Sequence, residues 1–249
     1  MICAMFIAIS QNSDNTYKVE QLDKHIEAKN TDIFEVEQGT DYKLFISDME
    51  STIIDNEFFD EIALQMGLGD KVADITARAM RGELDFTQSM HSRIELIKGV
   101  SKQQLLDIYH AKVKFNSGAH ELLKNLKQRG VYTVLVSGGF TLFSQLVADE
   151  LGFDKHYANI LQFDSADKLI GVQEPVLDRQ SKLKIMRQTC AELGIGLNQA
   201  IACGDGANDL DMLSNCGLPI AYKAKPNVKK VISNQLNYTD LSCINLLLK

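Results

Sequence analysis

The sequence has few cysteines and few prolines, and neither residue type is arranged as a structural device. The five cysteines form no C-x-x-C pair and are widely scattered, at Cys3, Cys190, Cys203, Cys216 and Cys243. A disulfide framework or a structural zinc site is therefore not expected, and a reducing cytoplasm suits such a chain. With three prolines in 249 residues and no low-complexity stretch, we expect no flexible Pro-rich or Gly/Ser-rich linker between domains.

Long apolar runs and an excess of positive charge are also missing. The apolar start, residues 1–9, is far shorter than the roughly 20 residues of a membrane-spanning helix and lacks the basic start and cleavage site of a signal peptide, so it is interpreted as a strand. The 26 Lys and Arg against 33 Asp and Glu give a formal net charge of -7. This balance argues against a protein that coats nucleic acid or an anionic membrane. Any anionic substrate must therefore be met by local cations.

Three short β-rich runs alternate with helical patterns. Residues 43–47, 131–137 and 200–203 each end at a polar or glycine-rich turn and are predicted to be buried parallel strands. Residues 119–129 place leucines at 122, 123 and 126 before Gly130, and residues 181–193 have a similar helical pattern. This order predicts an α/β fold with a Rossmann-like, doubly wound parallel sheet and right-handed crossovers.

Two regions depart from this alternation. Residues 58–113 contain several helix-like blocks and no strand signal, so we expect a small helical cap inserted after the first core strand. The core then consists of residues 41–57 and 114–249. Residues 1–40 are an N-terminal extension that is polar after its first ten residues and contains no motif, so the sequence assigns it no role.

The polar turns that follow the three predicted strands indicate where chemistry takes place. Ligands of an open parallel sheet bind beyond the carboxyl ends of its strands, and these ends carry DMEST at 48–52, SGG at 137–139 and GDGAND at 204–209. One acidic turn is more often a helix cap or a solvated loop. Three at one sheet edge predict a pocket of hard oxygen atoms and glycine amides that suits Mg²⁺ and a phosphate. Phosphoryl transfer is the chemistry that such a pocket supports.

The order DMEST, SGGF, a later lysine and GDGANDLDM, over residues 43–225, resembles the four motifs of the haloacid dehalogenase superfamily. The stretches DMESTIIDNE, VSGGFT, GDGANDLDML and IAYKAKP are similar to the phosphoserine phosphatases within it. The resemblance implies a Mg²⁺-dependent enzyme of serine biosynthesis that hydrolyses O-phospho-L-serine through a phospho-aspartyl intermediate. The expected partner is this small phosphorylated amino acid, not nucleic acid or a membrane, and a monomer or homodimer is expected.

The same resemblance assigns roles to single residues. Asp48 matches the nucleophile, and Lys182 matches the lysine that neutralises the phospho-aspartate, although by itself it would be an ordinary solvated lysine near a helix start. The other matches hold the metal and the phosphate. For the metal they are Asp48, Asp205 and the backbone carbonyl of Glu50, supported by Asp209; for the phosphate they are Ser137, the amide of Gly138 and Asn208.

The predicted cap contributes substrate recognition if the resemblance holds. Glu57 and Arg93 match positions that bind the amino and carboxylate groups of phosphoserine, while Met80 and Phe86 match residues that close over it. One carboxylate and one guanidinium suit a zwitterion, because Arg can hold a carboxylate with two parallel hydrogen bonds. The alternatives are a solvated Glu57, an Arg93 in a surface ion pair, and two ordinary core residues at positions 80 and 86.

Position 50 departs from the family pattern. Phosphatases of this group carry Asp there, which protonates the leaving oxygen and then activates water, whereas this chain has Glu50. The extra methylene matters, because a misplacement of about 1 Å can cost on the order of 10²-fold in rate. Three alternatives follow: Glu50 does the same work after a loop adjustment, the enzyme transfers phosphate to homoserine or another alcohol, or the protein is a weakly catalytic binder of a phospho-amino acid. The presence of Asp48, Lys182 and Asp205 argues against the third.

Other branches of the superfamily fit less well. P-type ATPases share GDGxND but require membrane spans, and dehalogenases need no magnesium and lack this phosphate-binding set. Sugar phosphatases and mutases stay open, although the pair Glu57 and Arg93 favours an amino-acid substrate over a sugar.

Overall fold

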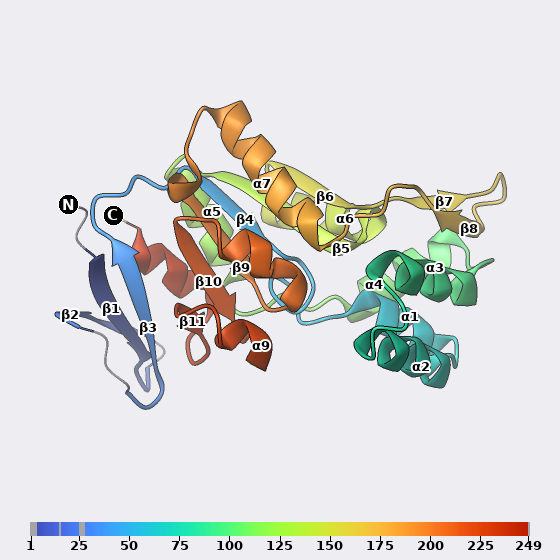
Figure 1. The fold of residues 1–249 in the computed structure, drawn as a ribbon, viewed down its shortest axis with the longest axis horizontal. Helices are drawn as coiled ribbons and strands as arrows, with labels where there is room; N and C mark the ends of the chain where they lie inside the picture. The colour runs from blue at the N-terminus through green and yellow to red at the C-terminus, as the bar shows by residue number, and fades with distance from the viewer. Residues whose placement is uncertain (1–3, 15, 25–27, 249) are drawn as a thin grey trace.

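A computed structural model describes residues 4–14, 16–24 and 28–248, except for the side chain of Met80. Its centre is a sheet of six parallel strands in the order β11-β10-β9-β4-β5-β6 (Figure 1). These strands are β4 (Leu44–Ser47), β5 (Tyr132–Phe140), β6 (Lys155–Asn159), β9 (Ala200–Gly204), β10 (Leu218–Tyr222) and β11 (Gln235–Leu236). The three predicted strands are confirmed and lie side by side, as β9, β4 and β5.

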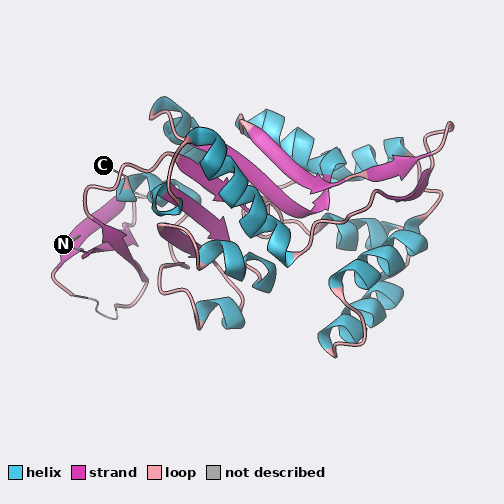
Figure 2. Ribbon diagram, turned by 45° about the horizontal axis from the view of Figure 1, so that its top comes forward, coloured by secondary structure: helices cyan, strands magenta, loops and turns pink. Residues whose placement is uncertain are grey.

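Helices cover both faces of this sheet (Figure 2). Alternate residues of β4 point to opposite faces, so Leu44 and Ile46 belong to one apolar cluster and Phe45 to the other. The first cluster includes residues of α7 (Arg179–Leu193), α8 (Leu210–Leu213) and α9 (Pro226–Lys229). The second includes residues of α5 (Ala119–Gln128), α6 (Thr141–Leu151) and the 3-10 helix η3 (Leu241–Leu247). The Rossmann-like, doubly wound core is therefore confirmed.

Four helices follow β4 and form an insertion at one end of the molecule (Figure 1). They are α1 (Phe58–Gln65), α2 (Gly69–Met80), α3 (Phe86–Ile97) and α4 (Lys102–Lys112). Capping boxes begin α3 and α4, because Asp85 and Ser101 each bond reciprocally with a glutamine three residues later. The helical cap after the first core strand is confirmed, whereas the domain limits given above stay a prediction.

A hairpin that the sequence analysis did not predict connects the core to this insertion. It consists of β7 (Leu161–Phe163) and β8 (Leu169–Val172), and it packs against α3. The backbone amide of Gly99 donates to the carbonyl of Leu169 at 2.8 Å, and the amide of Leu169 donates to the carbonyl of Val100 at 2.9 Å. The hairpin thus gives the cap a second attachment, in addition to the loops that enter and leave it.

The N-terminal extension is a three-stranded antiparallel sheet at the opposite end of the molecule (Figure 1). Its order is β2-β1-β3, with β1 (Ala4–Gln11), β2 (Tyr17–Leu22) and β3 (Thr31–Glu37). The strand expected over residues 1–9 is present from residue 4, and residues 1–3 lie outside the described residues. The side chain of Asn234 joins this sheet to the core, because it bonds both backbone groups of Glu35, at 2.7 and 3.0 Å. No helix in the described part of the chain is long and apolar enough to cross a membrane.

Candidate active site

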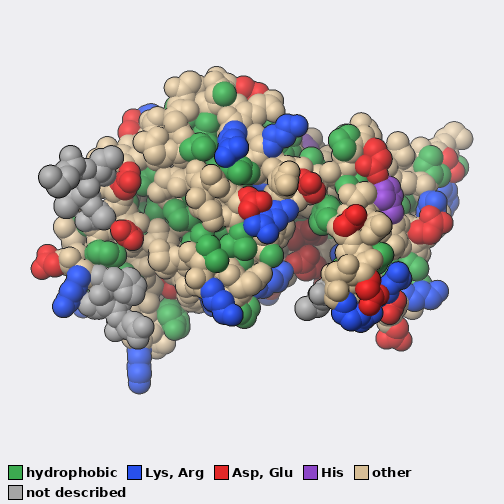
Figure 3. All heavy atoms as spheres, viewed as in Figure 1, with side chains coloured by type: hydrophobic (Ala, Val, Ile, Leu, Met, Phe, Trp, Pro, Cys, Tyr) green, Lys and Arg blue, Asp and Glu red, His purple; other side chains and the backbone are tan. Residues whose placement is uncertain are grey.

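The polar loops that follow β4, β5 and β9 meet at the carboxyl edge of the sheet, facing the helical insertion. A cavity of about 740 Å³ lies between them, and Figure 3 shows this region as a recess with acidic side chains in its depth. The core contributes Asp48, Glu50, Gly138, Gly139, Asp205 and Asn208 to the lining, and the insertion and its entry loop contribute Glu57, Phe59, Phe86, Met90 and Arg93. Predicted core and cap residues therefore line one cavity.

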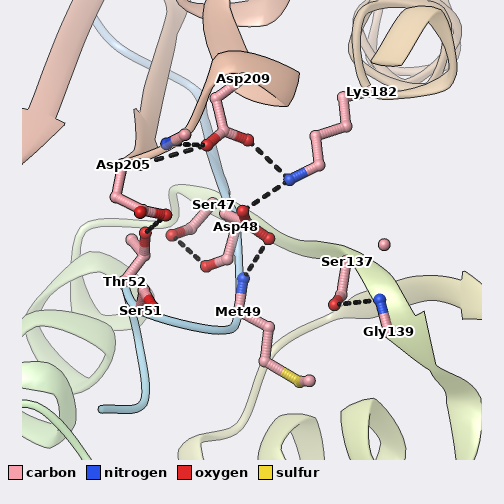
Figure 4. Close-up of polar contacts among 12 residues, drawn as sticks. Ser47, Asp48, Met49, Ser51, Thr52, Ser137, Gly139, Lys182, Asp205 and Asp209 are labelled. Carbon is pink, nitrogen blue, oxygen red and sulfur yellow. Dashed lines mark hydrogen bonds and ion pairs between the residues drawn. The ribbon is translucent and has the colours of Figure 1, made fainter. Parts of the chain in front are cut away.

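Asp48 lies at the end of β4 and is held in one orientation. One carboxylate oxygen accepts a hydrogen bond from the backbone amide of Met49 at 2.7 Å, and the other pairs with the Lys182 ammonium at 2.7 Å (Figure 4). Only 5% of the residue is exposed to solvent, and the cavity is where it is exposed. A buried, oriented carboxylate at the floor of a cavity has the placement that a nucleophile requires.

Lys182 comes from α7 and lies behind Asp48. Its ammonium is 2.7 Å from Asp48 and 2.6 Å from Asp209, and the residue is buried (Figure 4). Burial lowers the pKa of Lys182, but the two carboxylates outweigh this effect and hold the pKa above its usual value. Lys182 is therefore a fixed positive charge beside Asp48, and the alternative of a solvated surface lysine is wrong.

Three aspartates form a cluster of hard oxygen atoms. One carboxylate oxygen from each of Asp48, Asp205 and Asp209 lies within 4.8 Å of the other two. Asp209 accepts hydrogen bonds from the amides of Asp205 and Gly206, at 3.1 and 2.9 Å, and so fixes the loop that carries Asp205. Burial and the neighbouring charge of Asp209 raise the pKa of Asp48 to about 8. The cluster has an excess of negative charge and oxygen donors only, so a divalent cation fits it.

The turn after β5 presents backbone and hydroxyl groups to the cavity. Ser137 is buried and accepts a hydrogen bond from the amide of Gly139 at 2.9 Å. The carbonyl of Gly138 accepts one from the side chain of Asn159 at 2.8 Å, which holds the turn in place. Gly138 and Asn208 both line the cavity. Glycine amides beside a hydroxyl form a suitable cradle for phosphate oxygens.

Glu50 does not extend freely into the cavity. One oxygen accepts a hydrogen bond from the amide of Phe58, the first residue of α1, at 2.8 Å. A Cβ at position 139 would lie 2.8 Å from the other oxygen, so the longer side chain fits because Gly139 has none. Burial, followed by the charge of Glu57, raises the pKa of Glu50 to about 8.

Three of the predicted substrate-binding residues, Glu57, Phe86 and Arg93, line the cavity. Glu57 accepts a hydrogen bond from the Ser51 hydroxyl at 2.8 Å and faces the cavity, as Arg93 does. Arg93 forms no ion pair with any carboxylate of the described residues, so the surface ion-pair alternative has no support. Phe86 is 40% exposed and lines the cavity, so it is not a core residue. Met80 ends α2, and its side chain lies outside the described part of the structure.

Sequence reasoning missed several residues that line the cavity, among them Phe59 and Lys225. The backbone amide of Lys225 donates to the carbonyl of Asp205 at 2.9 Å, and its ammonium lies 3.3 Å from the Asp205 carboxylate. Lys225 follows β10, a strand that was not predicted. Recognising that strand would have pointed to Lys225 by the same rule about carboxyl ends.

Comparison with known proteins agrees with this geometry. Residues 42–217 match the family of haloacid dehalogenase-like hydrolases. The chain belongs to this family. It is 43% identical over 198 residues to the phosphoserine phosphatase of Polaromonas sp., a match that covers 77% of this chain and 83% of that protein. Members of this hydrolase family that act as phosphatases use a metal ion, which agrees with the carboxylate cluster.

Solved structures support the same assignment. A HAD family hydrolase from Salmonella enterica serovar Typhi is 27% identical, with a TM-score of 0.91 over 99% of this chain and 98% of its own. That match therefore includes the N-terminal sheet. A structure described as a phospho-aspartyl intermediate analogue of phosphoserine phosphatase is 36% identical, with a TM-score of 0.75 over 84% of this chain and 99% of its own.

Proposed function

We propose that this enzyme hydrolyses O-phospho-L-serine to L-serine and phosphate, with Mg²⁺ as its metal, as the last step of serine biosynthesis in the cytoplasm. The observation that carries the proposal is one cavity that joins a nucleophile to two recognition groups. Asp48, held against Lys182, lies on the floor, while Glu57 and Arg93 line the same cavity. The phosphoserine phosphatases to which the chain is 35–44% identical support this substrate.

In the first half-reaction, a carboxylate oxygen of Asp48 attacks phosphorus, and the bond between phosphorus and the serine oxygen breaks. Glu50, held by the amide of Phe58, gives its proton to that leaving oxygen. Lys182 stays charged beside Asp48 and offsets negative charge as the acyl phosphate forms. Ser137 and the amide of Gly138 bind the phosphoryl oxygens.

In the second half-reaction, water attacks the phosphorus of the acyl phosphate, and Glu50, now a carboxylate, accepts the proton of that water. The bond between phosphorus and the Asp48 oxygen breaks, and phosphate leaves. Asp48, Asp205 and the backbone carbonyl of Glu50 would hold magnesium, which would neutralise negative charge on the phosphoryl group. Proton donation followed by proton acceptance lets one carboxyl group serve both half-reactions.

The two recognition groups explain the preference for an amino acid. Glu57 is fixed by Ser51 and pairs with the substrate ammonium, while Arg93 pairs with the substrate carboxylate. A sugar phosphate offers neither charge, so it would leave Glu57 and Arg93 without partners in a partly buried site. This difference separates the proposed substrate from those of sugar phosphatases and mutases.

The assay that tests this proposal measures phosphate release from O-phospho-L-serine, with Mg²⁺ or with EDTA, and with L-serine or homoserine added as an acceptor. We expect rapid release with Mg²⁺, loss of release with EDTA, and no phosphorylated product formed from homoserine. Glucose 6-phosphate, the sugar control, should be turned over at least about 10²-fold more slowly in kcat/KM.

Each other outcome selects one alternative. Phosphorylation of homoserine would make the protein a phosphotransferase, and Glu50 would then activate water poorly. Binding of O-phospho-L-serine without turnover would make it a binding protein. Equal kcat/KM values for the sugar phosphate and phosphoserine would remove the roles of Glu57 and Arg93.

A further inference from the structure

Among the described cations at the cavity, Arg93 is the one without a carboxylate partner. The ammonium of Lys182 is held by Asp48 and Asp209, and that of Lys225 lies 3.3 Å from Asp205. Arg93 faces the same cavity, and its one side-chain hydrogen bond within the described part of the chain is to the hydroxyl of Thr76. No carboxylate of the described residues therefore balances the charge of this guanidinium, and it keeps N–H donors without a protein acceptor.

Three different helices of the cap hold this guanidinium. Arg93 comes from α3, and its Nη2 donates to the hydroxyl of Thr76 on α2 at 2.9 Å. The ring of Phe59 on α1 lies beneath it, with the guanidinium carbon 5.4 Å from the ring centre. The Nε atom of Arg93 is buried and has no hydrogen-bond partner.

The bond to Thr76 and the contact with Phe59 hold one side of the guanidinium, while the Nε donor of Arg93 has no hydrogen-bond partner among the described residues. A long arginine side chain otherwise loses rotamer freedom when it binds a carboxylate, and that loss weakens binding. The ring contact and the Thr76 bond hold Arg93 before any ligand arrives. Arg93 lines the cavity without a carboxylate of the described residues beside it, so a ligand that brings a carboxylate can pair with its guanidinium.

We propose that Thr76 is a positioning residue for substrate recognition, which orients Arg93 toward the carboxylate of the amino-acid substrate. The inference rests on the proposed function. Thr76 does not line the cavity, so it acts through Arg93 and not by touching the substrate. Its hydroxyl serves as an acceptor, which a serine retains and a valine of the same shape lacks.

The test compares two substrates that differ only in the carboxylate, O-phospho-L-serine and O-phosphoethanolamine. We expect Thr76→Val to raise KM for phosphoserine about tenfold. This factor corresponds to the loss of about one hydrogen bond to a charged group. Its kcat should stay within about twofold, because the contact is made equally in the ground and transition states. The kinetic constants for phosphoethanolamine should also stay within about twofold.

Two variants provide controls. Thr76→Ser keeps the acceptor and should restore the KM for phosphoserine to within about twofold of the starting enzyme. Thr87→Val makes the same change on α3, at a hydroxyl that Arg93 does not bond, and should leave both substrates unaffected. A general weakening of the cap would instead change the kinetics of both substrates in Thr76→Val.

The outcomes separate this inference from the proposed function. The quantity to compare is kcat/KM for phosphoserine divided by kcat/KM for phosphoethanolamine. If the starting enzyme prefers phosphoserine and Thr76→Val has the same ratio as the starting enzyme, Thr76 does not position Arg93 and the inference is wrong. Failure of Thr76→Ser to restore the KM contradicts it as well. If the starting enzyme itself does not prefer phosphoserine over phosphoethanolamine, the proposed recognition of the carboxylate fails.

Discussion

Replacing Asp48 by asparagine is expected to lower kcat for O-phospho-L-serine by on the order of 10⁴-fold or more. The amide cannot form the acyl phosphate, because its nitrogen and neutral oxygen are poor nucleophiles. The shape of the side chain is preserved, and the amide oxygen can still accept the hydrogen bond from Met49. Phosphate release under saturating substrate and Mg²⁺ is the measurement.

Folding of the Asp48→Asn variant should be unaffected or improved, so its inactivity would be a chemical effect. Burial and the charge of Asp209 already disfavour the Asp48 carboxylate. Asp211→Asn is a matched control, because Asp211 lies on the same GDGANDLDM stretch but pairs with Arg179 at the surface. The control should keep full activity. Full turnover by Asp48→Asn would show that the reaction does not pass through Asp48.

Replacing Asp32 by alanine is expected to lower the free energy of unfolding by about 3–5 kcal/mol, although this residue is far from the cavity. Asp32 is 2% exposed and comes from β3 of the N-terminal sheet. Its carboxylate accepts hydrogen bonds from the backbone amides of Asn237, Tyr238 and Thr239, and from the Thr239 hydroxyl. Alanine leaves these donors without that acceptor, and each buried unpaired group costs about 1–3 kcal/mol.

Urea unfolding followed by circular dichroism measures this change. Asp23→Ala is the control, because Asp23 lies at an exposed position just beyond β2, and its unfolding free energy should change by less than about 0.5 kcal/mol. A change of less than about 1 kcal/mol in Asp32→Ala would mean that the N-terminal sheet contributes little to the stability of the core.

The core was predictable because its signals are local in the chain. The runs at 43–47, 131–137 and 200–203 are short, apolar and followed by polar turns, and these become β4, β5 and β9. The motif residues at their ends then had to meet, since parallel strands present their carboxyl ends at one edge. Asp48 and Asp205 could therefore be brought together without knowledge of any distance.

The N-terminal sheet carries no comparable signal. The side chains of β2 are mostly exposed, so this strand lacks the alternation that marks a half-buried strand. The pairing of β1 with β3, for example Ala8 opposite Ile33, joins residues that are distant in the sequence. The attachment of Asp32 to residues 237–239 spans most of the chain, and no spacing rule indicates it.

The site likewise combines features that the sequence predicts with features that it does not. Glu50 was recognised as a departure from the family pattern, but its orientation depends on the amide of Phe58 and on the absence of a side chain at Gly139. Thr76 and Phe59 reach Arg93 from two other helices. Contacts of this kind follow from how helices pack, which the periodicity of one helix does not determine.

The most direct test of the central claim is to identify the phosphorylated residue during turnover. Glu50→Gln should be mixed with ³²P-labelled p-nitrophenyl phosphate and Mg²⁺ and quenched in acid, because this leaving group needs no proton from Glu50 while loss of the base still slows breakdown of the intermediate. The account predicts acid-stable label on the peptide that contains Asp48, which hydroxylamine removes, and no label in Asp48→Asn. Turnover by Glu50→Gln with label on another residue, or with none on the Asp48 peptide, would contradict it.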